Sequence, residues 1–268
     1  MIAPERDAVA RAGRESPLRE GLPFTGAADR DELTFREEIE PYPDPLSDIP
    51  QFIDSKRLPE YLATVLATAG IVPAGLVVEL GAGVCWLASA LARIPEVERV
   101  VAVEFSRRRI ADLAPIAIAH LGAPAAKVER IVADFHSPGL QAAGADLVVT
   151  DAAFHHSGDP SLLARVAGAA LKPGGSFLLM REPTTTPLRG RRDHGLEAEH
   201  GDFEHEYSRA RYLAFLEDAG LQAASYAAPG NLGSRRGRLV RRPPFSWLNG
   251  IAFSEYVYVG RKPREETA

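Results

Sequence analysis

An apolar strand that runs into a glycine loop, at residues 77–83, limits the possible folds of this chain more than any other segment. The segment has the sequence VVELGAG, with Glu79 near the end of the strand and Gly81 and Gly83 in the loop. Because glycine lacks a Cβ atom, the backbone can turn sharply there and a ligand can approach it closely. Such a loop between a strand and a helix is typical of the nucleotide site of a doubly wound sheet.

The composition is that of one globular domain with insertions. The chain has 268 residues, of which 46% are hydrophobic and 25% are charged, and both values are ordinary for a globular protein. Its formal net charge of −5 argues against a protein built mainly to hold nucleic acid. Cys85 is the one cysteine, so we expect no internal disulfide and no cysteine metal cluster, which fits a reducing cytoplasm. The sequence shows neither a secretory signal nor an apolar run of membrane-spanning length, so we expect a cytoplasmic protein without membrane contact.

Strands and helices alternate from residue 76 onward. Five strands rich in Val, Ile and Leu are expected at 76–80, 99–104, 128–133, 146–150 and 176–181, the last after a turn at 172–175. Apolar spacing predicts helices at 58–69, from 86 to 91, at 106–121 with a kink at Pro115, at 161–171, and around 212–216. Two further strands are expected at 221–226 and 253–259. This order predicts an α/β fold with a doubly wound, mostly parallel sheet and helices on both faces.

Other segments precede or interrupt this pattern. Residues 1–55 are expected to form an N-terminal arm or lid, separate from a main domain at 56–268. Residues 1 to about 30 are polar and are predicted to be weakly ordered or docked on the body, and the prolines at 41–50 predict an extended segment. Two polar insertions lie at about 183–206 and 227–250. Because long irregular insertions in compact domains are often functional, we expect them to cover a substrate.

The residues around the glycine loop indicate which nucleotide binds. Dinucleotide-binding proteins carry a third glycine three residues after the second, and Trp86 occupies that position here. A pyrophosphate on the helix N-terminus is therefore disfavoured. Glu79 would repel a phosphate and would suit a cation.

Acidic residues follow or end the next three strands. Glu104 is placed to accept both hydroxyls of a ribose. Asp134 is placed to accept from an adenine amino group, while Phe135 stacks on the ring. Asp151 ends the fourth strand. Since the carboxyl ends of parallel strands share one edge of a sheet, we expect these acids in one ligand site.

With these motifs the chain resembles the class I S-adenosylmethionine-dependent methyltransferases of the small-molecule type. The matching segments are residues 79–83, Glu104, 133–135, 151–156 and 171–175. The resemblance covers about residues 58–182 and implies a seven-stranded sheet whose last strand, at 253–259, is antiparallel. It implies S-adenosylmethionine as the cofactor, bound by Glu79, Gly81, Ala82, Gly83, Glu104, Phe105, Asp134, Phe135 and Asp151.

Within that set the resemblance assigns parts of the cofactor to particular residues. Gly81 to Gly83 would line its amino-acid part, Glu104 its ribose, and Asp134 with Phe135 its adenine. The segment before the first strand would close over the cofactor. Candidate contacts there are Tyr42, Phe52 and Lys56.

His155 and His156, just after the fourth strand, are candidate catalytic bases. Histidine titrates near neutrality, so either residue could take the proton of a hydroxyl as its oxygen attacks the methyl group. A structural role stays open, because the pair recurs in the family whatever the substrate. Trp86, Phe154 and Cys85 are expected to be buried packing residues.

The insertions supply candidate substrate contacts, namely His200, His205, Tyr207 and Arg235. His200 or His205 could also provide the base. The spacing of His and carboxylate residues in the first insertion matches no tight zinc pattern, so we expect no metal. The arginines at 235–242 form either a solvated face or a site for an anionic substrate group.

These features predict an enzyme that transfers a methyl group from S-adenosylmethionine to a small-molecule acceptor, a hydroxyl of a sugar-like or natural-product metabolite. Two alternatives stay open, an NAD-type oxidoreductase on a similar sheet and a non-catalytic cofactor-binding or assembly module. We expect no membrane or nucleic-acid partner, and a homo-oligomer stays open.

Overall fold

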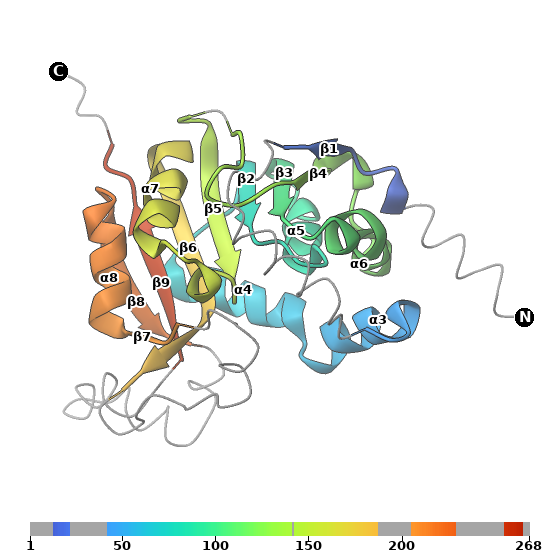
Figure 1. Cartoon of the computed structure of the whole chain (residues 1–268), viewed down its shortest axis with the longest axis horizontal. Helices are drawn as coiled ribbons and strands as arrows, with labels where there is room; N and C mark the ends of the chain where they lie inside the picture. The colour runs from blue at the N-terminus through green and yellow to red at the C-terminus, as the bar shows by residue number, and fades with distance from the viewer. Residues whose placement is uncertain (1–12, 22–41, 141, 187–204, 229–254, 265–268) are drawn as a thin grey trace, which may run out of the picture.

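The computed structural model describes residues 13–21, 42–140, 142–186, 205–228 and 255–264 (Figure 1). These residues form a nine-stranded sheet with the order β1-β4-β3-β2-β5-β6-β9-β8, and β7 pairs with β6 beside that path. The strands are β1 (Leu18–Glu20), β2 (Gly75–Leu80), β3 (Val97–Glu104), β4 (Val128–Val132), β5 (Ala145–Asp151), β6 (Leu171–Thr185), β7 (Tyr207–Ser208), β8 (Gln222–Ala227) and β9 (Glu255–Arg261). The pairs among β1 to β7 are parallel, whereas β9 is antiparallel to β6 and β8. The expected doubly wound sheet with an antiparallel last strand is confirmed, and β1 and β7 add to the seven strands expected.

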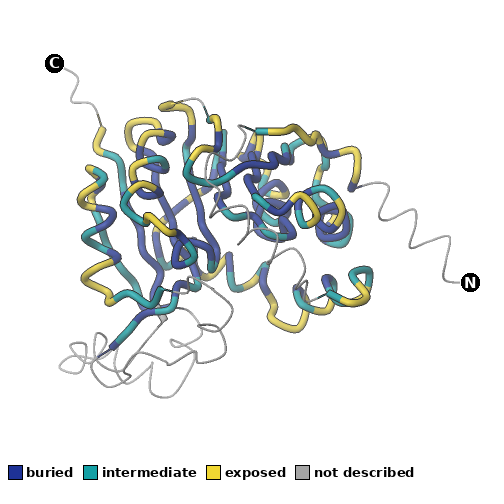
Figure 2. The backbone as a smooth tube through the Cα atoms, in the orientation of Figure 1, coloured by how far each residue is buried: buried dark blue, intermediate teal, exposed yellow. Residues whose placement is uncertain are grey.

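Helices cover both faces of the sheet. The α-helices are α3 (Pro45–Ser55), α4 (Leu58–Ala69), α5 (Trp86–Ala92), α6 (Ala114–His120), α7 (Pro160–Ala170) and α8 (Arg209–Asp218). Buried side chains of α3 to α6 pack against one face, and those of α7 and α8 pack against the other. The central strands are buried along most of their length, while the helices alternate between buried and exposed residues (Figure 2). None of the helices in these described ranges is long and apolar enough to cross a membrane.

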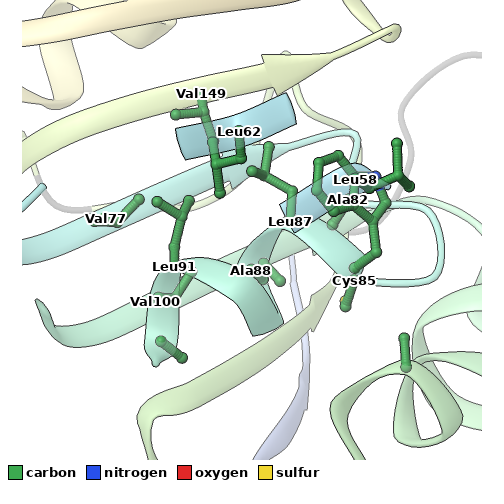
Figure 3. Close-up of a cluster of buried hydrophobic side chains, with 14 of the residues drawn as sticks. Leu58, Leu62, Val77, Ala82, Cys85, Leu87, Ala88, Leu91, Val100 and Val149 are labelled. Atoms are coloured by element: carbon green, nitrogen blue, oxygen red, sulfur yellow. The ribbon is translucent and has the colours of Figure 1, made fainter. Parts of the chain in front are cut away.

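The first of these cores fixes the helix that follows the glycine loop. Leu87 and Leu91 of α5 lie among Leu62, Val77 and Val149, from α4, β2 and β5 (Figure 3). All five side chains are buried. Burial of such side chains stabilises a fold by about 1.5–3 kcal/mol each. The start of α5, and with it the glycine loop, is therefore held firmly against the strand ends.

The proline-rich segment before residue 56 is largely helical, which differs from the sequence prediction. Residues 41–50 were expected to be extended, but α3 begins at Pro45 and contains Pro50. Pro45 stands in the first turn, where a missing N–H removes no hydrogen bond. Ile49 and Ile53 are fully buried against the core. We attribute the helix to this burial, which outweighs the hydrogen bond lost at Pro50.

The N-terminal residues 13–21 are docked on the edge of the sheet. β1 pairs with β4, and the buried Arg130 of β4 donates from Nη2 to the carbonyl of Ser16 at 2.7 Å and from Nε to its hydroxyl at 3.0 Å. Residues 13–21 therefore lie against β4 as an added edge strand. A buried guanidinium with these acceptors holds the segment in place because its charge would otherwise be unsatisfied.

Two other segments differ in detail from the prediction. Residues Arg108–Leu113 form a π-helix and α6 begins at Ala114, so Pro115 lies in the first turn of a new helix and does not kink a continuous one. The expected turn at 172–175 lies inside β6. There the partners step from Leu171 opposite Ala145 to Ser176 opposite Leu147, an irregularity that accommodates the extra residues.

Candidate active site

The carboxyl ends of β2 to β5 bring the predicted site residues together. A Cβ atom placed on Gly81 would lie 2.6 Å from Cβ of Ala153 and 3.7 Å from the ring of Phe135. The loops after β2, β4 and β5 therefore meet at Gly81. Its φ of +76° together with this close approach explains why glycine is required there.

The loop continues through Gly83, which faces open space. Gly83 has φ +51°, and a Cβ atom placed on it would meet no atom within 4 Å. The amides of Gly81 and Ala82 both donate to the carbonyl of Val103, at 2.9 Å each. Cys85, buried and with φ +60°, leads into α5. The loop is thus tied to β3 on one side and leaves room for a ligand beside Gly83.

Glu79 is buried at the end of β2. Its Oε2 accepts from the backbone N–H of Ala88 in α5 at 2.8 Å. Burial, with a smaller effect from the charge of Asp151, raises the pKa of Glu79 well above its usual range. The carboxyl group therefore joins the strand to the helix after the glycine loop.

Glu104 ends β3 with both carboxylate oxygens directed at backbone amides. Oε2 accepts from Gly83 N at 2.7 Å, and Oε1 accepts from Ser106 N at 3.0 Å. A carboxylate oxygen has more than one lone pair, so each oxygen can accept a further hydrogen bond. Phe105 follows directly and is partly exposed. This arrangement links the end of β3 to the open position at Gly83.

Asp134, which follows β4, is linked through His136 to the loop after β5. Its Oδ1 accepts from His136 N at 2.8 Å and lies 3.0 Å from His136 Nδ1, while His136 Nε2 lies 2.7 Å from the hydroxyl of Ser157. Burial alone would raise the pKa of Asp134, but the hydrogen bonds from His136 outweigh it and lower the pKa. Asp134 is therefore held as a charged acceptor beside Phe135.

Asp151, at the end of β5, is enclosed by Trp86 and Arg181. The indole Nε1 of Trp86 donates to Oδ2 at 2.8 Å, and Arg181 donates through Nε and Nη2 at 2.6 and 2.5 Å. Burial, offset in part by Arg181, raises the pKa of Asp151. Trp86 is buried as expected, and it also forms a hydrogen bond that sequence reasoning did not predict.

His155 lies in the short 3₁₀-helix Phe154–His156, which follows β5. Its side chain is hydrogen-bonded to Glu182 of β6. Its Nδ1 is 2.8 Å from Oε2 of Glu182, and both residues are buried. The same carboxylate accepts from the N–H groups of Ala153, Phe154 and His155 at 3.1–3.3 Å. The ring of His156 lies against that of His155, with centroids 4.0 Å apart and the ring planes tilted by 39°. One carboxylate thus fixes both the backbone and the imidazole of this segment.

A bulge in β6 directs Arg181 at Asp151, the last residue of β5, and Glu182 at the loop after β5. Leu179 pairs with Tyr258 and Glu182 with Tyr256, so β6 has one more residue than β9 between these pairs. Arg181 has φ +53°, and such bulges redirect side chains next to active sites. Sequence reasoning missed Arg181 and gave Glu182 no individual role. The sequence feature that could have indicated both residues is the abrupt change from an apolar strand to Arg181 and Glu182.

The candidate substrate residues fall partly inside the described structure. The amide of His205 donates to the carbonyl of His155 at 3.1 Å, which brings the end of the first insertion to the histidine pair. The ring of Tyr207 packs edge-on against Tyr212 and Phe215, with centroids 5.5 and 5.1 Å apart. His200 and Arg235 lie outside the described residues.

The candidate lid residues form a small group before α4. The ring of Tyr42 packs edge-on against that of Phe52 with centroids 6.2 Å apart, and Nζ of Lys56 lies 4.4 Å from the centre of the Phe52 ring. Tyr42 and Phe52 are partly buried against the core that covers α5. They lie on the same side of the sheet as the helix that follows the glycine loop.

Comparisons with known proteins agree with this geometry. Residues 78–179 match the family described as "Methyltransferase domain". No curated protein sequence matches the chain. A chain from the complex between the Haloferax volcanii Trm112 methyltransferase activator and a putative methyltransferase is 18% identical with a TM-score of 0.60, over 82% of this chain and 96% of that chain. A possible histamine N-methyltransferase of Thermotoga maritima is 16% identical with a TM-score of 0.53, over 87% and 100% of the two chains.

A third similar structure contains ligands. Phosphoethanolamine N-methyltransferase 2 of Haemonchus contortus, solved with phosphomonomethylethanolamine and S-adenosylhomocysteine, is 13% identical with a TM-score of 0.55, over 76% of this chain and 52% of that chain. At such identities the likeness is one of fold. The described sheet therefore has the class I methyltransferase fold, and residues 78–179 within it match the methyltransferase family model. The chain is an enzyme of this class, and its cofactor is S-adenosylmethionine. These findings favour the methyltransferase over the two alternatives from the sequence, an NAD-type oxidoreductase and a non-catalytic cofactor-binding or assembly module.

Proposed function

We propose that this enzyme methylates a hydroxyl group of a small-molecule acceptor, a sugar-like or natural-product metabolite, with His155 as the general base. The observation that carries the proposal is the hydrogen bond between Glu182 and Nδ1 of His155. A carboxylate can only accept, so Nδ1 donates the proton of this hydrogen bond, and in the neutral imidazole the lone pair is on Nε2. Glu182 also stabilises the imidazolium that forms when Nε2 takes a proton. A base positioned in this way contributes about 10²–10⁴ in rate.

The residues at the strand ends fit the adenosyl cofactor. When bound, S-adenosylmethionine supplies a methyl group already activated on a sulfonium. In this proposal Gly81, Ala82 and Gly83 line its amino-acid part, and the open space beside Gly83 supports that assignment. Glu79, with its carboxyl group behind the loop, and Asp151 complete that end of the site.

The nucleoside end of the proposed site uses the next two strands. Glu104, followed by Phe105, accepts the ribose hydroxyls, for which its carboxylate oxygens retain lone pairs. Asp134 accepts from the adenine amino group and Phe135 packs on the ring. The lowered pKa of Asp134 supports an acceptor that stays charged.

The acceptor lies, in this proposal, beside the histidine pair. His156 is the second candidate base because its ring lies against that of His155, with centroids 4.0 Å apart. His205 and Tyr207 belong to the substrate side, since His205 is bonded to the backbone of His155. His200 and Arg235 are proposed as further contacts from the insertions. We place the reaction in the cytoplasm, without a nucleic-acid or membrane partner and without a metal.

The acceptor class is tested by transfer of a labelled methyl group. The full chain is incubated with [methyl-³H]S-adenosylmethionine and a panel of glycosides, phenols, polyols and matched amines, and the products are analysed by mass spectrometry. We expect methyl ethers from hydroxylated members and a loss of about 10² or more in rate for His155→Asn. Products confined to amines, or unchanged turnover of His155→Asn, would contradict the proposal.

A further inference from the structure

We propose that Arg181 binds a carboxylate at the carboxyl edge of the sheet, supplied by the acceptor or by the amino-acid part of the cofactor. This inference rests on the proposed function of the same edge. Neither the methyltransferase chemistry nor the predicted cofactor residues give Arg181 a role. Its position, its backbone and its hydrogen bonds together point to a ligand.

The backbone of Arg181 is the first argument. Arg181 has φ +53°, in the left-handed region, which strains every residue except glycine. A glycine in this bulge would hold the same backbone without strain. The strained position nevertheless carries the longest cationic side chain. Strain of this kind persists at sites where the side chain is needed.

The hydrogen bonds of Arg181 are the second argument. A guanidinium has five N–H groups in a planar fork. Within the described residues, Arg181 donates from Nε and Nη2 to Asp151, and these are its only hydrogen bonds there. The two N–H groups of Nη1 therefore remain for a ligand. A ligand can reach the guanidinium, because 26% of the Arg181 side chain is exposed. The geometry suits a second carboxylate, because arginine binds such groups through two parallel hydrogen bonds.

The rigidity of Arg181 is the third argument. Asp151 is fixed by Trp86 Nε1 at 2.8 Å, and the guanidinium carbon lies 5.7 Å from the centre of the Trp86 ring. A fork held in this way loses little freedom when a ligand binds. Trp86 follows the glycine loop and Glu182 holds His155, so Arg181 stands between the cofactor loop and the proposed base.

The charge around Arg181 permits an anion. Asp151 is paired with Arg181 itself, and burial raises the pKa of Glu79 well above its usual range, which favours the uncharged acid. Glu182 is enclosed by the amides of the loop after β5. An acceptor with a carboxylate near its hydroxyl group would therefore be oriented by Arg181 while His155 faces the oxygen.

The first arm of the test measures cofactor binding by titration calorimetry on the full chain. S-Adenosylhomocysteine is compared with S-adenosyl-3-thiopropylamine, the analogue that lacks the carboxylate. If the cofactor supplies the carboxylate, the wild type binds S-adenosylhomocysteine about tenfold or more tightly than the analogue, and Arg181→Met abolishes this preference. Arg165→Met, on the exposed side of α7, leaves it unchanged.

The second arm measures methyl transfer to hydroxy acids and to their primary amides. If the acceptor supplies the carboxylate, the wild type prefers the acids by about tenfold or more in kcat/KM, and Arg181→Met loses that preference. Because Arg181→Met leaves Asp151 buried without its cation, the double variant Asp151→Asn/Arg181→Met is measured in parallel. Its asparagine still accepts from Trp86, and its thermal unfolding shows whether it is folded.

The outcomes separate this inference from the proposed function. The inference about Arg181 is overturned if the wild type shows neither preference, or if a preference that the wild type shows survives in the folded variants without Arg181. Methylation restricted to amines, with an Arg181-dependent preference for S-adenosylhomocysteine, would remove the hydroxyl proposal and leave Arg181 as the carboxylate-binding residue.

Discussion

Oε2 of Glu182 lies 2.8 Å from Nδ1 of His155, and the same carboxylate caps the backbone of the segment that carries the histidine. The contact joins β6 to the loop after β5, at the edge of the sheet where the proposed cofactor residues converge. With Glu182 as a carboxylate, it favours the neutral tautomer of His155 that carries its proton on Nδ1. The proposed chemistry depends on that choice.

Replacement of Glu182 tests this role directly. Glu182→Gln keeps the size of the side chain but removes the charge that stabilises an imidazolium. We expect kcat/KM for methyl transfer to fall by about 10² or more, while the affinity for S-adenosylhomocysteine stays within about twofold of the wild type. Glu217→Gln, on the exposed side of α8, serves as the control. An equal loss of cofactor affinity would show that Glu182 acts mainly on the cofactor.

Two glycines provide a matched pair for the cofactor loop. Gly83 and Gly122 have φ of +51° and +61°, and a Cβ atom on either would meet no atom within 4 Å. Gly83→Ala and Gly122→Ala should each lower the free energy of unfolding by about 1–2 kcal/mol from backbone strain. Only Gly83→Ala should weaken S-adenosylhomocysteine binding, since its methyl group enters the proposed ligand space. Equal affinities in calorimetry would place the ligand away from Gly83.

Glu104 should determine how tightly the nucleoside binds. Glu104→Gln replaces one carboxylate oxygen with a donor, which opposes a ribose hydroxyl and one of the two amides at Gly83 and Ser106. We expect the binding free energy of S-adenosylhomocysteine to weaken by about 1–3 kcal/mol. Glu98→Gln, exposed on the same strand, should have no effect. If the two variants bind equally well, the ribose is held elsewhere.

Glu79 should make stability depend on pH. Burial, and then Asp151, raises its pKa well above 4.5 in the folded protein. For an acid with a raised pKa, its contribution to stability is full below the unfolded-state pKa and is lost as pH rises through the folded-state pKa. Glu79→Gln lacks this loss. We measure urea unfolding of both proteins as a function of pH. The unfolding free energy of Glu79→Gln minus that of the wild type should increase from about pH 4.5 upward, by at most about 1.4 kcal/mol per pH unit. Parallel pH profiles would contradict this.

The sheet and its proposed binding edge were predictable because their signals are local. Apolar runs predicted β2 to β6, and the acids Glu79, Glu104 and Asp151 stood at the strand ends where the structure places them. The helix α3 was not predictable from its prolines, since the burial of Ile49 and Ile53 depends on a surface formed by distant residues.

The side-chain network was not predictable for a similar reason. Arg181 and Glu182 are neighbours in the chain, and an alternating strand would direct them to opposite faces. The bulge at this point, which depends on pairing with β9, directs both toward the carboxyl end of β5 and the loop that follows it. Likewise, nothing in the sequence pairs His136 with Ser157, 21 positions apart.

A crystal structure of the full chain with S-adenosylhomocysteine tests the central claim most directly. We predict that the ribose hydroxyls bind Glu104, that the adenine lies against Phe135 with its amino group on Asp134, and that the sulfur faces the side of His155. A nucleoside bound at another edge of the sheet, or a ribose that makes no contact with Glu104, would contradict the account.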